Sequence, residues 1–462
     1  MIKDLAIVIC NFNKVDYLKG CLKTLCKSNL ANLSSDIIVV DNASTDGSAQ
    51  FIKDFYKKII LLENETNTGG SGGFDRGIKF AIQGEYKYLV LLDNDILLEE
   101  NTILNLVKYI EVNPNVGVVG SKICTMDNPN ILQEMGSYID FEEGFNIKTP
   151  FKGYRDNDSL PKIVNCDYVP ACCLITTNEV LNKVGSFNTD HFIYWDDMDW
   201  CTRIKREGFE IHAINESRVF HKMGVTNHAN TFGVYYFERN RIMFFLKYLE
   251  EDKLEKFINK TCEWLISMTF FANLKGDFST PKSLLLSFLD LSFNNLGRQD
   301  NSILEKVIEV DLLNKYKLSK ENKVCLYLGN NIETNRKIFN YLNDIFKDDI
   351  KIVFANTDKS LISEHFIINE VLTLEDFHSN EFDVVFYALD HILNYNKSFS
   401  HSKNYIYIDG YFNTSSMNDI ESVIISYKSY KDIFTNIFKP VYKEMLKKIR
   451  KEMYNAKSLS FT

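Results

Sequence analysis

The sequence predicts an α/β protein with a mostly parallel β-sheet, followed by a helical region and a second, smaller α/β domain. Two observations predict this fold class. Over the first ~120 residues, short and continuously apolar runs alternate with amphipathic helical segments, which is the pattern of parallel strands covered by helices on both faces. A shorter alternation of the same kind returns toward the C-terminus. With 462 residues, the chain is also longer than one hydrophobic core usually supports.

Four apolar runs in the N-terminal part have the length and composition of buried strands, and a helical pattern follows each of them. The predicted strands are residues 5–10, 35–41, 58–64 and 86–95, and the predicted helices are residues 15–28, 46–57, 74–84 and 101–113. Ligands of such sheets bind at the carboxyl ends of the strands. We therefore expect the polar residues that follow these ends to converge on one edge of the sheet: Asn11, Asp41, the glycine-rich stretch 67–77 and the acidic stretch 93–95.

The rest of the chain changes in character twice. The sequence up to about residue 240 is less regular, the next stretch is helical and apolar, and four further strand-like runs follow between residues 323 and 410. We therefore expect three parts: a larger α/β domain over residues 1–240, a helical region over 241–315 and a small α/β domain over 316–462.

Composition limits the class of protein. The net charge of −9 and the pI near 5.5 argue against a nucleic-acid-binding protein, which needs a basic surface. The ten cysteines show no zinc-ligand spacing, and we interpret them as reduced thiols, with Cys172 and Cys173 filling a core. The first apolar run is too short for a signal peptide, and no segment reaches the roughly 18 apolar residues of a membrane span. These features predict a cytoplasmic protein.

Two strand ends carry acidic residues. The sequence LLDND places Asp93 and Asp95 two residues apart at the end of a buried strand. Such acids can cap the next helix or, with Asn94, hold a divalent cation and a diphosphate, because hard oxygen ligands suit Mg²⁺ and Mn²⁺. Asp41, in VVDNASTDGS, ends the second strand. The Asp41 side chain can stabilise a turn, or its carboxylate can accept a hydrogen bond from the imide N–H of a uracil or thymine ring.

Glycine is concentrated in one place, since five of the eleven residues in NTGGSGGFDRG are glycine. Glycine permits positive φ angles and close approach of the backbone, so the stretch is either a flexible loop or a place where a ligand meets the main chain. Between a strand and a helix, backbone amides around Gly70, Gly72 and Gly73, together with Arg76, would face an anionic or sugar-bearing ligand. The stretch matches neither a dinucleotide fingerprint nor a P-loop.

A third acidic group lies in YWDDMDWCTR, where Asp196, Asp197 and Asp199 stand between Trp195 and Trp200. An acidic cluster is usually a solvated face of the protein. Enclosed by tryptophans, a partly buried carboxylate can instead act as a general base on an acceptor hydroxyl. The sequence leaves both interpretations open.

One histidine completes the pattern. His221 follows an apolar strand in VFHKMG; alone it would be structural, but beside a carboxylate pair that lacks a third ligand we expect it to bind the metal. Six motifs, in order over residues 4–240, resemble those of the family 2 inverting glycosyltransferases with the GT-A fold: IVICNFN, VVDNASTDGS, NTGGSGGFDRG, LLDND, YWDDMDWCTRIKREG and FHKMG. The resemblance covers about half of the chain and predicts a hexosyltransferase.

The resemblance implies a role for each matching residue. Asp41 would bind the nucleotide base, Asp93 would lie near the ribose or the metal, and Asp95 and His221 would bind Mn²⁺ or Mg²⁺. Asp197 would be the general base, with Asp196 at the position where glutamate is commoner, and Arg239 and Asn240, in YYFERNRIMF, would support the acceptor side. The full predicted site has the catalytic residues Asp196 and Asp197, the metal ligands Asp93, Asp95 and His221, and the nucleotide-sugar-binding residues Asn11, Asp41, Gly70, Gly72, Gly73, Arg76, Asp93, Asn94 and Trp195.

The implied reaction is a single displacement in which an acceptor hydroxyl attacks the anomeric carbon and configuration inverts. The paired glycines followed by phenylalanine in GGSGGF, and WDD with an acid two residues further on, resemble the galactofuranosyl- and rhamnosyltransferase branches. They predict UDP-galactofuranose as the donor, with dTDP-rhamnose next, and a hydroxyl of a bacterial capsule, O-antigen or cell-wall polysaccharide as the acceptor.

Two other functions stay open. A sugar-phosphate nucleotidyltransferase would use a similar sheet and carboxylates, but it would need a basic glycine-rich loop where CNFNKVDYL stands. A scaffold that binds nucleotide sugars without catalysis is the other alternative. The intact set of Asp93, Asp95, Asp197 and His221 argues against such a scaffold.

The last predicted helix, KPVYKEMLKKIRKEMYNAK, carries Tyr442, Leu446, Ile449 and Met453 on one stripe among basic residues. It either packs on the small domain or lies on an anionic membrane surface. The second interpretation would suit a lipid-linked glycan acceptor and a peripheral location on the inner face of the plasma membrane. The C-terminal region is also the place where we would expect oligomerisation.

Overall fold

The computed structural model describes residues 3–84, 86–222, 231–299, 311–329, 331–346, 350–354, 371–372, 382–395, 405–416 and 419–459. The chain forms two compact units: Met1–Thr261, Lys282–Val307 and Glu444–Thr462 make the first, and Cys262–Pro281 and Ile308–Lys443 make the second. Three helices contribute residues to both units: α8 (Glu251–Leu274), α9 (Ser279–Ser292) and α14 (Ile420–Leu459). The unit boundaries therefore fall inside helices, whereas the boundaries expected from composition lie at residues 240 and 315.

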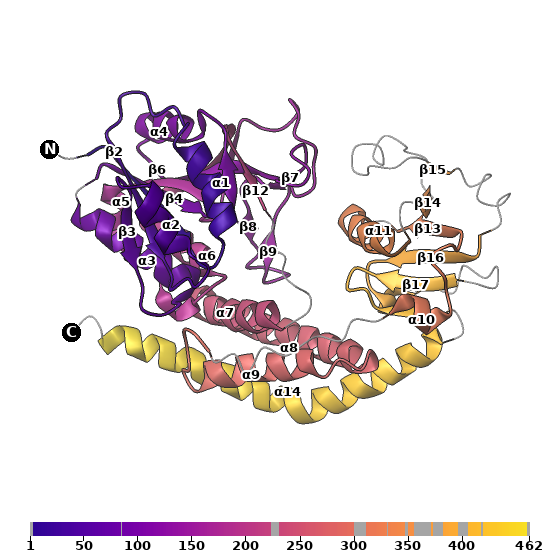
Figure 1. Ribbon diagram of the computed structural model, residues 1–462. Coiled ribbons are helices and arrows are strands. Elements are labelled where there is room, and N and C mark those ends of the chain that lie inside the picture. The colour runs from indigo at the N-terminus through magenta and orange to yellow at the C-terminus, as the bar shows by residue number, and fades with distance from the viewer. Residues whose placement is uncertain are drawn as a thin grey trace. The chain divides into compact units, whose positions relative to one another are not determined.

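The first unit is built on a ten-stranded sheet with the order β10-β12-β6-β11-β4-β1-β2-β3, in which β5 pairs with β12 and β7 with β6 (Figure 1). The strands are β1 (Leu5–Asn11), β2 (Ser35–Asp41), β3 (Ile60–Glu63), β4 (Tyr88–Asp93), β5 (Ile96–Leu98), β6 (Val116–Thr125), β7 (Leu132–Glu134), β10 (Ile163–Cys166), β11 (Cys173–Thr177) and β12 (Glu210–His221). A two-stranded sheet of β8 (Tyr138–Ile139) and β9 (Ile147–Lys148) is separate from it.

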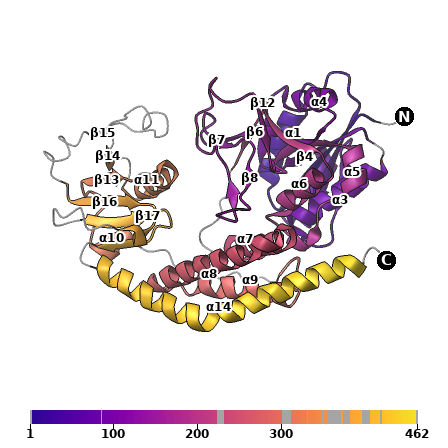
Figure 2. The same ribbon diagram turned by 180° about the vertical axis from the view of Figure 1, so that it is seen from behind.

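The predicted parallel core is confirmed. Strand β1 runs parallel to β2 and β4, and β2 runs parallel to β3. The pairing places Asn11 opposite Asp41 and Cys10 opposite Asp93, so the strand ends do meet at one edge. The helices of this unit, seen from two sides in Figures 1 and 2, are α1 (Val15–Leu25), α2 (Ser48–Phe55), α3 (Gly69–Gln83), α4 (Thr102–Val112), α5 (Asn178–Val184), α6 (Asp196–Arg206) and α7 (Phe232–Tyr248).

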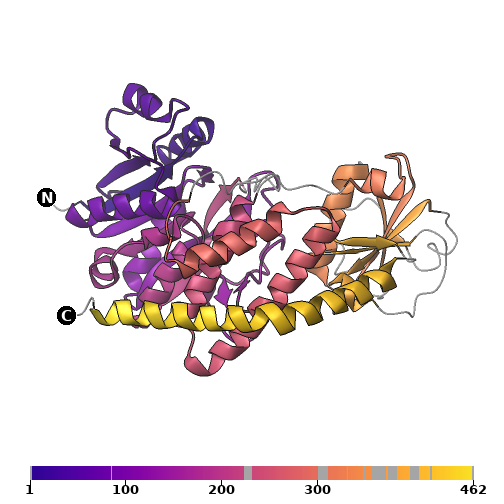
Figure 3. The ribbon, with the colours of Figure 1, turned by 90° about the horizontal axis from the view of Figure 1, so that it is seen from below.

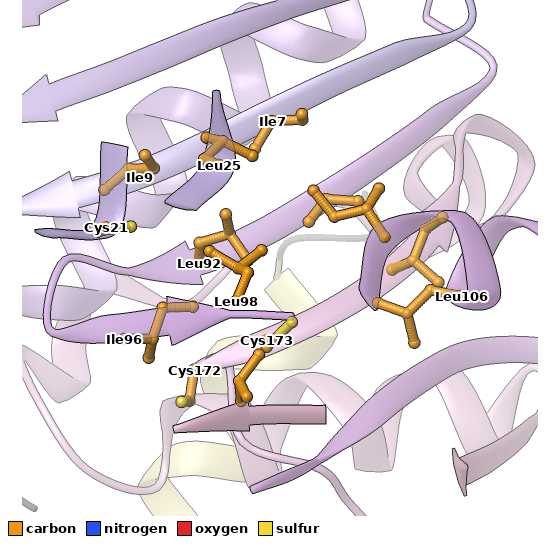
Figure 4. Packing of buried hydrophobic residues seen from close by; sticks show 14 of the residues in the cluster. Ile7, Ile9, Cys21, Leu25, Leu92, Ile96, Leu98, Leu106, Cys172 and Cys173 are labelled. Atoms are coloured by element: carbon orange, nitrogen blue, oxygen red, sulfur yellow. The ribbon is translucent and has the colours of Figure 1, made fainter. Parts of the chain in front are cut away.

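Alternate residues of β1 serve the two faces of the sheet, as expected for a strand with helices on both sides. Ile7 and Ile9 pack in one core with Leu25 of α1 and Leu106 of α4 (Figure 4). On the opposite face, β1 meets α3. There a β-carbon at Gly73 would lie 2.2 Å from Cys10 Sγ, and one at Gly77 would lie 2.3 Å from Val8 Cγ1.

Helix α3 starts earlier than the sequence pattern predicts. The predicted helix begins at residue 74, whereas α3 begins at Gly69 and includes the paired glycines. The reason is packing: Gly73 and Gly77 let the helix backbone approach β1 more closely than any side chain would permit. The glycine-rich stretch is therefore mainly the contact face of a helix. Gly70 differs, because a β-carbon there would meet nothing within 4 Å.

The second unit has a six-stranded sheet with the order β15-β14-β13-β16-β17-β18, parallel except for the last pair. This confirms the small α/β pattern. Its elements are α10 (Leu312–Tyr316), β13 (Val324–Leu328), α11 (Ile332–Phe346), β14 (Ile350–Phe354), β15 (Val371–Leu372), β16 (Val384–Leu389), β17 (Tyr405–Asp409) and β18 (Thr414–Ser416). The core lies between the sheet and α11, with Leu326, Ile338 and Phe386 at its centre.

Helix α14 is continuous over 40 residues and contains Pro440 (Figure 3). Of its predicted apolar stripe, Leu446 and Ile449 are buried. Both belong to the first unit, where the neighbouring Arg450 donates a hydrogen bond to the Leu249 carbonyl at 2.8 Å. These two residues of the stripe therefore pack in the first unit, whereas Tyr442 belongs to the second. Among the helices of the described residues, none is both long and apolar enough to cross a bilayer.

Candidate active site

Asn11 is the centre of a polar cluster at the carboxyl ends of β1, β2 and β4. Its amide nitrogen donates to Asp41 Oδ1 at 3.0 Å and to Ser44 Oγ at 3.2 Å, and its Oδ1 accepts from Asn94 Nδ2 at 2.7 Å. The second oxygen of Asp41 accepts the Ser44 backbone N–H at 2.9 Å, and the residue is 2% exposed. These bonds fix the turn after β2. Recognition of a base by Asp41 stays a prediction and would have to use lone pairs that these bonds leave.

The acidic motif after β4 faces His221 from the end of β12. His221 Nε2 lies 3.2 Å from Asp95 Oδ1 and 3.9 Å from Asp93 Oδ2. The other Asp95 oxygen is paired with Lys14 Nζ at 2.5 Å. Burial and the neighbouring Asp95 raise the pKa of Asp93 to about 6, although His221 and Lys14 oppose this rise. The carboxyl groups of Asp93 and Asp95 therefore have different pKa values.

Neighbouring charges shift the pKa values of Asp95 and His221 in opposite directions. Burial disfavours the ionised Asp95, but the hydrogen bond from His221 and the charge of Lys14 outweigh it and hold the pKa of Asp95 below its usual range. Burial likewise lowers the pKa of His221, but the hydrogen bond to Asp95 and the charges of both carboxylates raise it above its usual range. The raised pKa of His221 reflects the negative charge of the two carboxylates, whereas the lowered pKa of Asp95 reflects the positive charges beside it.

This donor set fits a divalent cation. His221 Nδ1 lies 2.9 Å from Gln133 Oε1, so Nδ1 carries the proton and Nε2 is directed at the carboxylates. An imidazole whose far nitrogen is held by an oxygen acceptor is the usual arrangement of a metal-binding histidine. Two carboxylates and one imidazole nitrogen suit Mn²⁺ or Mg²⁺. Without an ion, Lys14 supplies the compensating positive charge at Asp95.

The loop before the second acidic motif is strained. Phe192, Tyr194 and Trp195 have φ angles of 63°, 64° and 66°, a region that side-chain-bearing residues rarely adopt and that costs about 1–3 kcal/mol per residue. Two buried residues of α7 hold it. Asn240 Nδ2 donates to the carbonyls of residues 191, 193 and 194 at 2.9, 2.8 and 3.0 Å, and Arg239 Nη2 donates to those of residues 190 and 191, both at 3.0 Å.

Helix α6 begins directly after this loop, with Asp196 and Asp197 in its first turn. Asp196 accepts a hydrogen bond from Ser71 Oγ at 2.7 Å, and the Ser71 backbone N–H donates to the Phe192 carbonyl at 3.1 Å. A β-carbon at Gly69 would lie 2.0 Å from that same carbonyl oxygen. The glycine-rich start of α3 and the loop that carries the acids are therefore fitted to each other.

Asp197 is a carboxylate with a raised proton affinity. Burial, then the charges of Asp196 and Glu134, raise its pKa well above its usual range. Its Oδ1 accepts the backbone N–H of Met198 at 2.9 Å. A carboxylate whose pKa is raised toward neutrality is a better proton acceptor when it is ionised.

Asp199 has a different task from its two neighbours. It is fully buried and accepts from Arg203 Nε at 3.0 Å, Lys247 Nζ at 2.5 Å and the Tyr248 hydroxyl at 2.8 Å. Despite burial, the charges of His191, Lys247 and Arg203 hold the pKa of Asp199 far below its usual range. This residue ties α6 to α7.

Two predicted ligand-binding side chains are directed elsewhere in the structure. Arg76 donates to the Glu63 carbonyl at 2.6 Å and to the Asn64 side chain, at the end of β3. Trp195 is fully buried against Phe237, Phe244 and Phe245. Gly72 and Gly73 face Thr68 and Cys10, so of the three predicted glycines Gly70 alone has open space beside its α-carbon.

Sequence reasoning missed four polar residues that shape the site: Lys14, Ser71, Gln133 and Glu134. Lys14 follows the same strand end as Asn11, so the strand-end rule could have found it. Ser71 stands inside the glycine-rich stretch. Gln133 and Glu134 lie on β7, whose three residues carry no readable periodicity. Cys172, interpreted as core, is buried but also belongs to a group with Asp93 and His221 whose ligand atoms lie within 4.8 Å of one another.

The sheet order and the acidic site define an α/β domain of the GT-A class. Residues 6–178 match the family model described as glycosyl transferase family 2. This part of the chain therefore matches the family that the six motifs resemble.

Curated relatives agree with this family. A low-salt glycan biosynthesis hexosyltransferase of Haloferax volcanii is 24% identical over 53% of this chain and 76% of its own length. The galactofuranosyltransferase GlfT2 of Mycobacterium tuberculosis is 23% identical over 40% of this chain and 31% of its own length. Among solved structures, a mannosyltransferase of Pyrobaculum calidifontis in complex with GDP-Man and Mn²⁺ has a TM-score of 0.40 and 14% identity, covering 64% of this chain and 76% of that one.

Proposed function

We propose that this protein is a metal-dependent inverting glycosyltransferase that moves a sugar from a nucleotide sugar to a hydroxyl group of a glycan. One observation carries the proposal. A metal-competent group, made by Asp93, Asp95 and His221, and a carboxylate with a raised pKa, Asp197, lie at the same edge of the sheet of a family 2 domain. Asp196 belongs to both neighbourhoods, because its charge raises the pKa of Asp93 as well as that of Asp197.

Each residue of the site would have its own role in the reaction. Ionised Asp197 would take the proton of the acceptor hydroxyl as its oxygen attacks the anomeric carbon, and the nucleoside diphosphate would leave from the opposite face. A Mn²⁺ or Mg²⁺ ion held by Asp93, Asp95 and His221 would supply positive charge for the departing diphosphate. When the ion binds, the Lys14 ammonium group would leave Asp95 and contact solvent or a phosphate instead. Ser71, Arg239 and Asn240 would keep the loop before Asp197 in place.

For the donor we propose UDP-galactofuranose, with dTDP-rhamnose as the second candidate. The glycine-rich stretch and the WDD motif support this choice, and so does the detectable identity to a galactofuranosyltransferase. The acceptor we propose is a hydroxyl of a bacterial cell-surface glycan, carried on a lipid. The open space at Gly70, at the start of α3, is a place for part of the donor.

The test is a donor screen with metal. The purified chain with Mn²⁺ is offered UDP-galactofuranose, UDP-galactopyranose, UDP-glucose, UDP-N-acetylglucosamine and dTDP-rhamnose, and release of nucleoside diphosphate is followed. We expect turnover of one donor, abolished by EDTA and by Asp95→Ala, and unchanged in Asp16→Ala, a matched aspartate whose side chain is 88% exposed on α1.

The alternatives give different results in the same assay. Release of pyrophosphate from a nucleoside triphosphate and a sugar phosphate would indicate a nucleotidyltransferase. Metal-dependent UDP binding with no transfer to any acceptor would indicate a scaffold. Full transfer by Asp197→Asn would show that Asp197 is not the base.

We also propose a cytoplasmic protein in peripheral contact with the inner face of the plasma membrane. Ile433, Ile437 and Val441 recur every four residues on α14 and are 57%, 60% and 58% exposed. Such an apolar stripe on a lysine-rich helix suits an anionic bilayer surface. Flotation with anionic vesicles, compared between the native chain and Ile437→Asp, tests the contact. Oligomerisation through the C-terminal region remains a prediction, which sedimentation would test.

A further inference from the structure

The sheet places Cys172 beside the metal-competent carboxylates. The Asp93 backbone N–H donates to the Cys172 carbonyl at 3.0 Å, and the next pair in this antiparallel ladder joins Leu92 to Cys173. Residues that oppose each other across two strands keep their side chains close. The side chains of Cys172 and Cys173 point in opposite directions (Figure 4), and Cys173 Sγ accepts a hydrogen bond from Ser121 Oγ at 3.1 Å.

His221 is fixed against the same two residues by its own backbone pairing. It stands opposite Ile96 where β12 meets β5, and the next residue, Lys222, donates its N–H to the Asp95 carbonyl at 3.0 Å. Gln133 Oε1 holds the Nδ1 side of the ring at 2.9 Å. Two strand pairings and the hydrogen bond to Gln133 therefore bring one oxygen of Asp93, Cys172 Sγ and one nitrogen of His221 within 4.8 Å of one another.

That spacing is near the one that a single ion requires. Zinc–ligand bonds of about 2.0–2.3 Å in tetrahedral geometry put the ligand atoms about 3.4–3.8 Å apart. A movement of about 1 Å by these side chains would close the set around one ion. Asp95 does not belong to this three-residue group, and one of its oxygens is paired with Lys14 Nζ at 2.5 Å.

From this geometry we infer that Asp93, Cys172 and His221 form a binding site for a borderline-soft divalent cation of the zinc class. The site shares Asp93 and His221 with the proposed Mn²⁺ or Mg²⁺ site but replaces the Asp95 oxygen with a sulfur. Hard cations prefer oxygen, whereas sulfur and imidazole nitrogen prefer zinc-class ions. On binding, the Cys172 S–H bond breaks, the proton goes to solvent and the thiolate donates its electron pair to the ion.

Sharing two ligands makes the two ions mutually exclusive. A zinc-class ion would therefore inhibit the enzyme, and excess Mn²⁺ or a chelator would restore activity. This inhibition rests on the proposed function, whereas the cation site does not. Cys172→Ser would remove the sulfur ligand and keep Asp93, Asp95 and His221, so we expect it to abolish the zinc sensitivity while Mn²⁺ dependence persists.

Co²⁺ is the spectroscopic probe, and the full chain is stripped with EDTA and dialysed before the measurement. We expect a near-ultraviolet thiolate-to-cobalt band and strong visible absorption of a four-coordinate ion, both displaced by Zn²⁺. Cys172→Ser should lose the near-ultraviolet band and weaken Zn²⁺ binding at least tenfold. Two matched controls should keep it: Cys173→Ser, whose side chain points away, and Cys26→Ser, the exposed cysteine.

Several results would overturn the inference. These are no thiolate band in the native chain, a band that persists in Cys172→Ser, or a band that Cys26→Ser removes. X-ray absorption at the zinc edge of the native chain needs no variant, and a shell of nitrogen and oxygen alone would overturn it equally. A sulfur-bound ion in a chain that transfers no sugar would support this site and count against the proposed function. Sugar transfer that zinc does not inhibit would support the proposed function and count against this site.

Discussion

Asn240 holds a strained loop, and replacing it by aspartate should damage the protein more than replacing it by alanine. The side chain is fully buried, and its amide nitrogen contacts three loop carbonyls at 2.8–3.0 Å. Asn240→Ala removes the donor and leaves a small gap. Asn240→Asp keeps the shape but turns a carboxylate oxygen toward carbonyl oxygens, so an attraction becomes a repulsion or the carboxyl must take up a proton.

The magnitude follows from the contacts that are lost. The carbonyl of residue 191 retains Arg239, so alanine removes the amide donor from the carbonyls of residues 193 and 194. At about 1–2 kcal/mol for each buried acceptor left without that partner, Asn240→Ala should cost about 2–4 kcal/mol, and the aspartate about 1–3 kcal/mol more. The three positive φ angles store strain of at least about 3 kcal/mol. The loss is therefore large enough to release the loop, and transfer should fall more than tenfold.

Urea unfolding followed by tryptophan fluorescence measures this cost, because Trp195 and Trp200 lie next to the loop. Donor turnover is measured on the same samples. Asn182→Ala on α5, where an exposed asparagine bonds only its neighbour Asn178 in the described structure, is the matched control and should change stability by less than about 0.5 kcal/mol. Equal stability of the alanine and aspartate variants would refute the assignment of Asn240 as a donor to the loop.

Three further predictions concern charge and close packing. Glu134→Gln removes a charge that helps burial to raise the pKa of Asp197, so the acid limb of the pH–rate profile should move to lower pH by about half to one pH unit, and an unmoved limb would contradict this. Gly73→Ala, which forces a methyl against the sulfur at the end of β1, should cost about 1–3 kcal/mol in chemical denaturation, while Gly70→Ala should leave stability unchanged. Asp199→Asn leaves two cations without their carboxylate and should lower the free energy of unfolding by about 3–5 kcal/mol. Because the pKa of Asp199 is lowered on folding, the difference in unfolding free energy between the native chain and this variant should be full above about pH 4 and shrink below it.

The first four strands of the sheet could be predicted from the sequence because a local apolar run marks each of them, whereas the pattern does not resolve the later strands one by one. Continuous apolar runs such as 5–10 and 35–41 need no knowledge of distant residues, and the strand-end rule then places Asn11, Asp41 and Asp93 on one edge. The start of α3 could not be predicted in the same way. It depends on how closely Gly73 approaches Cys10, a contact that is decided only when the helix has packed on the strand.

The same distinction applies to the site. The acids and His221 were readable because each stands in a recognisable motif. Lys14 and Asp95 are 81 residues apart, and Gln133 and His221 are 88 apart, so neither pairing leaves a local signal. Cys172 was readable as core and is core, but its place opposite Asp93 follows from an antiparallel strand whose register the sequence does not reveal.

The short strand β7 has a thermodynamic consequence. Its consecutive residues Gln133 and Glu134 act on different parts of the site, because the first holds the His221 ring and the second adds to the proton affinity of Asp197. Two consecutive residues of one strand thus act on the His221 ring and on Asp197. Linkage is reciprocal: whatever factor a bound cation imposes on the proton affinity of Asp197, the proton on Asp197 must impose on the affinity for the cation.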